Sequence, residues 1–169
     1  MAAPPFVPAH FAPPPPPRGP GFVLTPLLVA HNERDLAAWA SSVEHIHATP
    51  GFATYPWPDE PMTLERNERD LAAHEDDFAR RVGFTYTVLS EEDGDVIGCV
   101  YIYPSAKDGC DADVRSWVRA SRAGLDELLY AVVIDWLGAA WPFATFDYAS
   151  RACDRDGIDQ SGEEPPATS

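Results

Sequence analysis

Two carboxylates in this sequence stand where they could exchange a proton with a substrate. Asp113 lies in a segment, 111–119, in which polar and apolar residues alternate. In a β-strand this alternation places every second side chain on one face, so Asp113 would share a face with Trp117. Because a carboxylate can take a proton from an ammonium group directly or through water, Asp113 and Asp147, which lies in a later strand-like run, are the candidate catalytic bases. The alternative is a solvated strand face that carries only cross-strand ion pairs.

An aromatic and proline-rich connection, 52–61, has the composition of a binding loop. It carries aromatic rings and carboxylates on a backbone stiffened by prolines, and connections of this kind often bind ligands. The candidate substrate-binding residues are Tyr55, Trp57, Asp59 and Glu60. The two carboxylates favour a cationic substrate. The alternative is that Tyr55 and Trp57 only close the edge of the core.

The spacing of cysteine and histidine favours neither a metal centre nor a thiol nucleophile. The three cysteines have no CxxC spacing, and Cys99 lies inside an apolar run, which predicts a buried thiol. His45 and His47 would point in different directions on a helix, because they are two residues apart. We therefore expect no metal site. An odd number of cysteines without a framework favours a reducing compartment.

Charge and hydropathy exclude several classes of partner. A net charge of −15 argues against a nucleic-acid partner, which would require clustered lysine and arginine. No apolar run has membrane-spanning length, so we expect no membrane partner, and the N-terminus lacks the pattern of a secretory signal. These features together predict a cytoplasmic protein. One lysine against eleven arginines, with abundant alanine and proline, suggests a GC-rich bacterial genome.

Composition divides the chain into a central domain and two flanking arms. Nine of the 18 prolines precede Gly21, and five of these are consecutive, which predicts a Pro-rich disordered arm over 1–20. Residues 152–169 are acidic and contain no hydrophobic cluster, which predicts an acidic disordered tail. The folded domain is therefore expected to span 21–151.

Hydrophobic periodicity predicts an α+β domain, in which helices flank a mixed but mostly antiparallel central sheet. The sequence Asn-Glu-Arg-Asp-Leu-Ala-Ala occurs twice, at 32–38 and 67–73, and is expected to begin or lie within two similar helices. The expected order of elements is β-α-α-β-β-β-α-β. The elements are strand 22–29, helices 33–47 and 64–82, strands 84–89, 96–103 and 111–119, helix 125–137 and strand 143–148.

Short motifs in these strands and at the last helix match a known arrangement. Thr-Tyr-Thr-Val-Leu at 85–89 is followed by Val-Ile-Gly-Cys-Val at 96–100, and Arg-Ala-Gly-Leu-Asp at 122–126 precedes a helix. With the order of elements, these motifs make 21–148 resemble the GNAT superfamily of acyl-CoA-dependent N-acetyltransferases. The resemblance implies an N-acyltransferase that moves an acetyl or other acyl group from acyl-CoA to an amine of a small molecule or peptide. Acetyl-CoA would be its co-substrate.

The same resemblance implies where acetyl-CoA would bind. The family's fourth strand separates from its fifth and opens a wedge for the pantetheine arm, and N–H groups of the following loop hold the pyrophosphate. Gly124 would stand in this loop, where it would permit a close approach or a positive φ. The residues that the resemblance assigns to the cofactor are Trp117, Val118, Arg119, Arg122, Ala123 and Gly124.

Two alternatives to a complete enzyme remain open. A single glycine in the pyrophosphate loop and a tail-like composition after the last strand favour a non-catalytic GNAT-like binding or interaction module. A second copy of the chain could also pair with the exposed last strand, which would give a homodimer.

Overall fold

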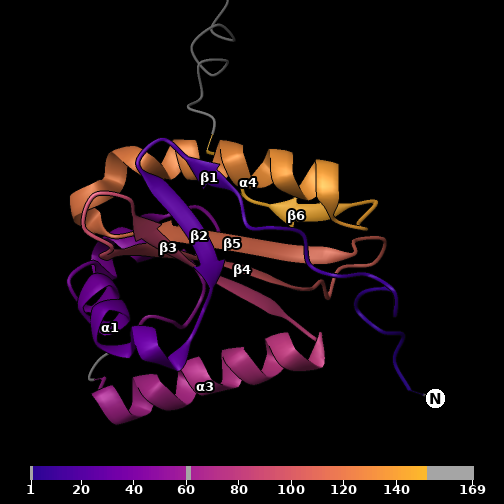
Figure 1. Ribbon diagram of the computed structural model, residues 1–169, viewed down its shortest axis with the longest axis horizontal. Helices are drawn as coiled ribbons and strands as arrows, with labels where there is room; N and C mark the ends of the chain where they lie inside the picture. Colours follow the sequence, from indigo (N-terminus) through magenta and orange to yellow (C-terminus); the bar gives the residue numbers. More distant parts are fainter. Residues whose placement is uncertain (1, 60–61, 152–169) are drawn as a thin grey trace, which may run out of the picture.

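The computed structural model describes residues 2–59 and 62–151, and within them a mixed sheet lies between two layers of helices (Figure 1). The strands are β1 Arg18–Gly19, β2 Phe22–Pro26, β3 Phe84–Ser90, β4 Val96–Pro104, β5 Ala112–Val118 and β6 Phe146–Tyr148. The helices are α1 Asn32–Ala40, α2 Val43–Ala48, α3 Leu64–Arg80 and α4 Asp126–Ala140, with 3₁₀ turns η1 Val29–His31 and η2 Ala120–Leu125. This arrangement confirms the predicted α+β class and the predicted order of the main elements.

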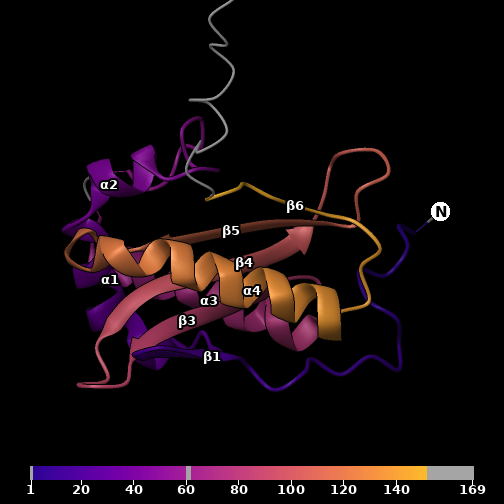
Figure 2. The ribbon, with the colours of Figure 1, turned by 90° about the horizontal axis from the view of Figure 1, so that it is seen from above.

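The strands follow their order in the sequence, β1-β2-β3-β4-β5-β6. Neighbouring strands are antiparallel except β5 and β6, which are parallel because α4 crosses the sheet between them (Figure 2). The parallel pairing is short and joins 112–114 to 146–148. The remainder of β5, from Arg115 onward, therefore has a strand partner only on its β4 side among the described residues.

Each face of the sheet carries its own hydrophobic core. On one side α4 packs Leu129, Val133 and Leu137 against β2 to β5, all three without measurable exposure. On the other side α1 and α2 contribute Trp39 and Ile46 to a second core. Figure 1 shows α4 on the first face and α1 and α3 on the second. Because both faces of the sheet are covered, successive side chains along a strand point alternately into one core and the other.

The predicted helix 33–47 is two helices in the structure. Ser41 donates hydrogen bonds of 2.9 Å and 3.0 Å from its hydroxyl to the carbonyls of Ala37 and Ala38. A serine hydroxyl that competes for backbone carbonyls disfavours continuation of a helix. α1 therefore ends at Ala40, and α2 begins at Val43.

The repeated heptapeptide brings α1 and α3 together. The first copy starts α1, and the second lies inside α3, whose N-cap is Thr63 rather than Asn67. Asn67 Nδ2 donates to Asn32 Oδ1 at 2.8 Å and to Asp35 Oδ2 at 3.0 Å. Equivalent residues of the two copies thus meet across the helix pair, and Asn67 acts as a bridge between the helices rather than as a cap.

The N-terminal arm differs from the disordered segment expected for 1–20. Val7 is 3% exposed, and Phe6 and Phe11 pack against the core under α4. The ring of Phe6 lies 5.2 Å from that of Phe143. The polyproline run lacks regular structure, but apolar residues on either side of the turn at Pro8 hold the arm on the domain. The predicted acidic tail, 152–169, lies outside the described residues.

Candidate functional site

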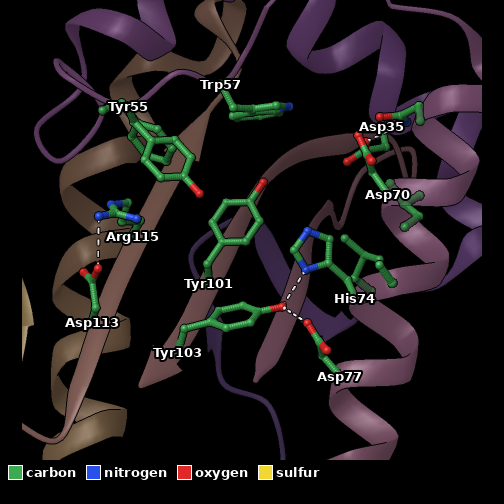
Figure 3. A pocket seen from close by; sticks show the side chains of 15 residues that line it. Asp35, Tyr55, Trp57, Asp70, His74, Asp77, Tyr101, Tyr103, Asp113 and Arg115 are labelled. Atoms are coloured by element: carbon green, nitrogen blue, oxygen red, sulfur yellow. Dashed lines mark hydrogen bonds and ion pairs between the residues drawn. The ribbon is translucent and has the colours of Figure 1, made fainter. Parts of the chain in front are cut away.

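A cavity of about 520 Å³ lies on the α1–α3 side of the sheet. Its floor is β4 and β5, one wall is α3, and the loop after α2 covers it. Figure 3 shows aromatic rings from the loop and from β4 facing the same space as the carboxylates of α1 and α3. The lining residues with polar or aromatic side chains are Asp35, Phe52, Tyr55, Trp57, Asn67, Asp70, His74, Asp77, Tyr101, Tyr103, Asp113 and Arg115.

Three of the sequence-predicted site residues, Tyr55, Trp57 and Asp113, line this cavity. Asp113 pairs with Arg115 at 3.0 Å, and the Arg115 guanidinium lies 4.5 Å from the centre of the Tyr55 ring. Trp57 packs against Trp117, with 5.9 Å between the rings. Asp113 therefore has an ion-pair partner two residues along its own strand rather than the cross-strand partner of the alternative interpretation, and its role as a base stays a prediction.

The other predicted carboxylates of the site lie elsewhere. Asp147, on β6, pairs with Lys107 at the exposed edge of the sheet and does not line the cavity. Asp59 is exposed and lies 3.5 Å from Arg66. Glu60 lies outside the described residues. Asp113 and Asp147 are register partners in the parallel β5–β6 pair, so they lie next to each other on one face of the sheet, and a strand position alone could not show that the cavity reaches only Asp113.

One face of α3 supplies a stripe of polar side chains to the cavity. Asn67, Asp70, His74 and Asp77 are spaced by three or four residues, so they lie on one side of the helix. The helix is placed by Thr63, whose hydroxyl accepts a 3.1 Å hydrogen bond from the Arg66 backbone N–H. This stripe is recognisable in the sequence as a polar helical face, but nothing in the sequence shows that it is turned inward.

His74 is oriented by a chain of hydrogen bonds. The Tyr103 hydroxyl donates to Asp77 Oδ2 at 2.9 Å, and His74 Nδ1 lies 2.8 Å from the same hydroxyl (Figure 3). Thr85 Oγ1 also lies 3.0 Å from His74 Nδ1. With the Tyr103 proton directed to Asp77, a proton on His74 Nδ1 would be accepted by the Tyr103 and Thr85 oxygens, and this tautomer leaves the lone pair on Nε2. Burial lowers the pKa of His74, so the ring is neutral near pH 7. The Asp77–Tyr103–His74 chain therefore presents a proton acceptor.

Asp35 is a buried carboxylate at one end of the cavity. It is 3% exposed, and its oxygens contact Asn67 Nδ2 and the Cys99 thiol at 3.0 Å and 3.5 Å. Burial, with a smaller contribution from the charge of Asp70, raises the pKa of Asp35 to about 6. Cys99 has no exposed area, which confirms the predicted burial of this thiol, and burial also raises its pKa.

The residues assigned to the acyl-CoA wedge are partly buried in the two cores. Trp117 has no exposed area and donates from Nε1 to the Tyr101 hydroxyl at 3.0 Å. Val118 is 1% exposed in the core under α4. The pairing of β4 with β5 runs without a bulge, and a Cβ on Gly98 would lie 1.9 Å from the Trp117 carbonyl oxygen. The close contact between Gly98 of β4 and Trp117 therefore keeps this part of β5 paired with β4.

The turn that follows β5 is a closed 3₁₀ turn, η2. Arg119 pairs with Asp95 at 2.8 Å, and the Ala120 N–H donates to the Ser42 hydroxyl at 2.9 Å. Arg122 and Ala123 lie within the turn. Gly124 has no positive φ, and a Cβ added to it would meet no protein atom within 4 Å, so only its predicted role in the close approach of a pyrophosphate stays a prediction.

Arg151 fills the space beside β5 where β6 has left the sheet. Its guanidinium is nearly buried and donates to Asp126 Oδ2 at 2.8 Å and to the Ser116 carbonyl at 2.6 Å. The Tyr148 hydroxyl lies 2.6 Å from the Ser116 hydroxyl. In this arrangement the paired side chains of Arg151 and Asp126 occupy the space that the resemblance assigns to the pantetheine arm and the pyrophosphate. The described residues therefore fit acetyl-CoA only after Arg151 has moved.

Solved structures share this architecture. A candidate ribosomal-protein-serine acetyltransferase from Vibrio cholerae aligns with a TM-score of 0.61 over 85% of this chain and 76% of its own, at 12% identity. An acetyltransferase of the GNAT family from Bacillus anthracis aligns with a TM-score of 0.52 over 72% of this chain and 65% of its own, at 6% identity. The chain has the GNAT acetyltransferase fold. At these identities the likeness concerns the fold.

A third solved structure shares the fold over part of its length. A GCN5-related N-acetyltransferase from Brucella melitensis also has the GNAT fold, with a TM-score of 0.56 at 14% identity over 75% of this chain. The chain spans 56% of that protein's length. No protein-family model matches the sequence, and neither does any curated protein. Evidence for the activity of this protein therefore comes from its own residues.

Among residues 2–59 and 62–151, no helix is long and apolar enough to cross a membrane. Within the same part of the chain, no group of three or more histidine, cysteine, aspartate or glutamate side chains is arranged to hold a metal ion.

Proposed function

We propose that the protein is an N-acyltransferase that moves an acetyl group from acetyl-CoA to an amine bound in the α1–α3 cavity. The observation that carries this proposal is the neutral His74, whose Nε2 faces an acidic and aromatic cavity built on the GNAT fold. Transfer to an amine requires the loss of a proton from the ammonium form, and a histidine with a lowered pKa is suited to accept it.

The chemical step is simple in outline. The deprotonated amine nitrogen forms a bond to the thioester carbonyl carbon, and the carbon–sulfur bond breaks to release the CoA thiol. The proton of the ammonium goes to His74 Nε2, directly or through water, and the Asp77–Tyr103 pair keeps the ring in the required tautomer. The rings of Trp57 and Tyr101, whose centres lie 6.4 Å apart, would shield a bound amine from water on this side of the cavity.

The donor would approach along the open side of β5. For this, Arg151 must leave the Ser116 carbonyl, which is a side-chain movement near the end of the described residues. A guanidinium freed from Asp126 could then pair with a phosphate of the donor. This role of Arg151 adds to the wedge residues assigned by resemblance, among which Arg119 is held by Asp95.

The test combines binding and turnover. Protein and acetyl-CoA are incubated with a panel of primary amines, and free CoA and acetylated amine are quantified by mass spectrometry. We expect amine-dependent release of CoA, at least tenfold slower in His74→Gln. His10→Gln serves as a control because His10 is exposed and lies outside the cavity. No rise in melting temperature at millimolar acetyl-CoA, together with no release of CoA, would contradict the proposal.

A second function is favoured by the Arg151 contact. If Arg151 keeps the wedge closed, the GNAT fold is a module that binds a ligand in the α1–α3 cavity without turnover. Stabilisation by amines without binding of acetyl-CoA would support this function and contradict the transferase. A second copy of the chain would pair with the three-residue edge strand β6 to give a homodimer. Sedimentation equilibrium measures this oligomeric state directly.

The cellular setting is also part of this proposal. We propose a cytoplasmic, bacterial protein without a nucleic-acid partner. The net charge of −15 argues against a nucleic-acid partner, the odd number of cysteines favours a reducing compartment, and one lysine against eleven arginines favours a GC-rich bacterial genome. Acetyl-CoA is available in that compartment. Fractionation of a bacterial host that carries the native gene tests the location.

A further inference from the structure

The Arg151 side chain connects two parts of the molecule that serve different substrates in the proposed function. Its Nε donates to Asp126 Oδ2 at 2.8 Å, and its Nη2 donates to the Ser116 carbonyl at 2.6 Å. Both contacts lie beside β5, where the donor would enter. Its Nη1 donates at 3.2 Å to the carbonyl of Pro50, which lies in the loop that covers the cavity. One guanidinium therefore holds both the donor space and the covering loop, 49–59.

The site around Arg151 has the shape and chemistry of a guanidinium receptor. Its hydrogen-bond acceptors within the described residues are the Asp126 carboxylate and the backbone carbonyls of Pro50, Ser116 and Ala149. The guanidinium carbon lies 6.0 Å from the centre of the Tyr130 ring and 5.7 Å from that of Tyr148. Because a guanidinium presents five donors in one plane and stacks on aromatic rings, it matches these groups better than an ammonium does.

The covering loop is held where it passes the segment that carries Arg151. Gly51 follows Pro50 with a φ of +96°, and a Cβ added to it would lie 3.7 Å from the Ala149 side chain. A few residues later the same loop places Tyr55 on the cavity (Figure 3). Release of the Pro50 carbonyl would therefore loosen the loop over the cavity.

Arg151 and the donor cannot occupy the space beside Ser116 at the same time. The side chain of Asp126 is mostly shielded from water, and its Oδ1 has no hydrogen-bond partner among the described residues, so its charge depends on Arg151. This dependence stabilises the closed state. When only a fraction of the molecules is open, the apparent affinity for the donor falls by that fraction.

We propose that Arg151 is an autoinhibitory latch, which fills the donor space beside Ser116 and fixes the covering loop through Pro50. Entry of acetyl-CoA displaces the guanidinium and breaks both contacts at once, so occupation of the donor space releases the loop over the acceptor cavity. This inference rests on the proposed function for the identity of the displacing ligand. It deepens that function, because it assigns control of both substrate sites to one side chain.

Calorimetric titration with acetyl-CoA measures the closed state. Asp126→Asn removes the charge that holds the latch and leaves the guanidinium in place, so it should bind acetyl-CoA at least tenfold more tightly than the parent. Asp76→Asn is the matched control, because it removes one negative charge from an exposed ion pair of α3. It should bind acetyl-CoA like the parent, which separates the latch from the general charge of the protein. A two-dimensional NMR spectrum verifies the fold of each variant.

Hydrogen exchange tests the hold on the loop without any donor. The Phe52 and Tyr55 amides donate to carbonyls of the same loop. In Arg151→Ala they should exchange at least tenfold faster than in the parent, with a smaller change in α3, which distinguishes local release from a general loss of stability. Arg80→Ala, which removes an exposed arginine, should leave both amides unchanged. Ethylguanidinium should refill the site in Arg151→Ala, restore slow exchange and compete with acetyl-CoA, whereas ethylammonium should not.

The outcomes distinguish the latch from the transferase. The inference is overturned if Asp126→Asn folds and binds acetyl-CoA no more tightly than Asp76→Asn, or if loop exchange is unchanged in a folded Arg151→Ala. In either case the transferase stands when the parent releases CoA in the presence of an amine. Tighter binding by Asp126→Asn without release of CoA contradicts the transferase and leaves the latch intact. Absence of acetyl-CoA binding in the parent and in every variant overturns both.

Discussion

Arg151 Nε donates a 2.8 Å hydrogen bond to Asp126 Oδ2, at the first turn of α4. The arginine side chain is 2% exposed and the aspartate side chain 18%, so the pair is largely shielded from water. It joins the last described residue to the helix that covers one face of the sheet. The pair closes the space beside the first turn of α4 with an internal contact, and both proposed functions depend on whether this contact opens.

Removal of one partner of this pair should be costly. Arg151→Ala leaves the Asp126 charge shielded and unpaired, and we expect a loss of about 3 kcal/mol in the free energy of unfolding, measured by urea titration. Arg18→Ala is the control, because its pair with Glu91 is exposed and should contribute less than about 1 kcal/mol. Similar losses in the two variants would show that Arg151 is not a structural anchor.

Two glycines should respond in opposite ways to alanine. At Gly98 a Cβ would lie 1.9 Å from the Trp117 carbonyl oxygen, so Gly98→Ala must displace β5 and should cost about 3 kcal/mol. At Gly124 no atom lies within 4 Å of the added methyl, and Gly124→Ala should leave stability unchanged or raise it by up to about 1 kcal/mol. Chemical denaturation of both variants provides the comparison. A larger loss at Gly124 than at Gly98 would contradict this account of the turn.

Asp35 should make stability depend on pH in an unusual direction. Its pKa is raised from 3.8 to about 6, so the folded state holds this proton more tightly than the unfolded chain. The stabilisation that Asp35 gives the folded state is complete below about pH 4 and is lost as the pH rises through the folded-state pKa of about 6. Asp35→Asn should therefore gain stability relative to the parent between pH 4 and 7, by up to about 3 kcal/mol.

The measurement is the difference between parent and Asp35→Asn unfolding free energies at pH 4, 5, 6 and 7. Taking this difference cancels the pH-dependent contributions of carboxylates that are not coupled to Asp35. Asp70 remains coupled, since its charge contributes to the raised pKa. Glu68→Gln should show no such trend, because Glu68 is exposed. A difference that does not change with pH would mean that Asp35 is already ionised at pH 4 in the folded protein.

The N-terminal arm should contribute to stability through Phe6. Its ring lies 5.2 Å from Phe143 and 6.0 Å from Phe84, and it is partly buried. Phe6→Ala should lower the free energy of unfolding by about 1–2 kcal/mol, visible as a lower melting temperature. Pro15→Ala, at an exposed position of the same arm, should have little effect. An unchanged melting temperature for Phe6→Ala would show that the arm is not held by this ring in solution.

Much of the fold was predictable because its signals are local. The apolar run of β4, the alternation of residues in β5 and the helical spacing in α4 are patterns among residues at most four positions apart, and the strands and the helix that they predicted were confirmed. The break between α1 and α2 was missed, although Ser41 and the following serine are a recognisable local signal. The burial of Cys99 followed from its apolar surroundings in the chain.

The site was predictable only in part. Tyr55 and Trp57 lie on the cavity as their loop composition indicated, whereas Asp147, the register partner of Asp113 on β6, lies beyond the cavity beside Lys107. His74 was passed over, because its sequence neighbours show no metal-ligand spacing. Its orientation depends on Tyr103, which is 29 residues away on another element.

Local patterns in the sequence were sufficient to assign the main strands and helices, because backbone geometry converts a repeat of two or of three to four residues directly into a face. The two copies of the heptapeptide were also visible there. Only in the folded chain do these copies meet, with Asn67 bridging to Asn32 and Asp35, and only there does Arg151 close the space beside Ser116. Such contacts depend on how helices cross and on where the chain turns after β6, and no local pattern encodes the distance between residues so far apart in the chain.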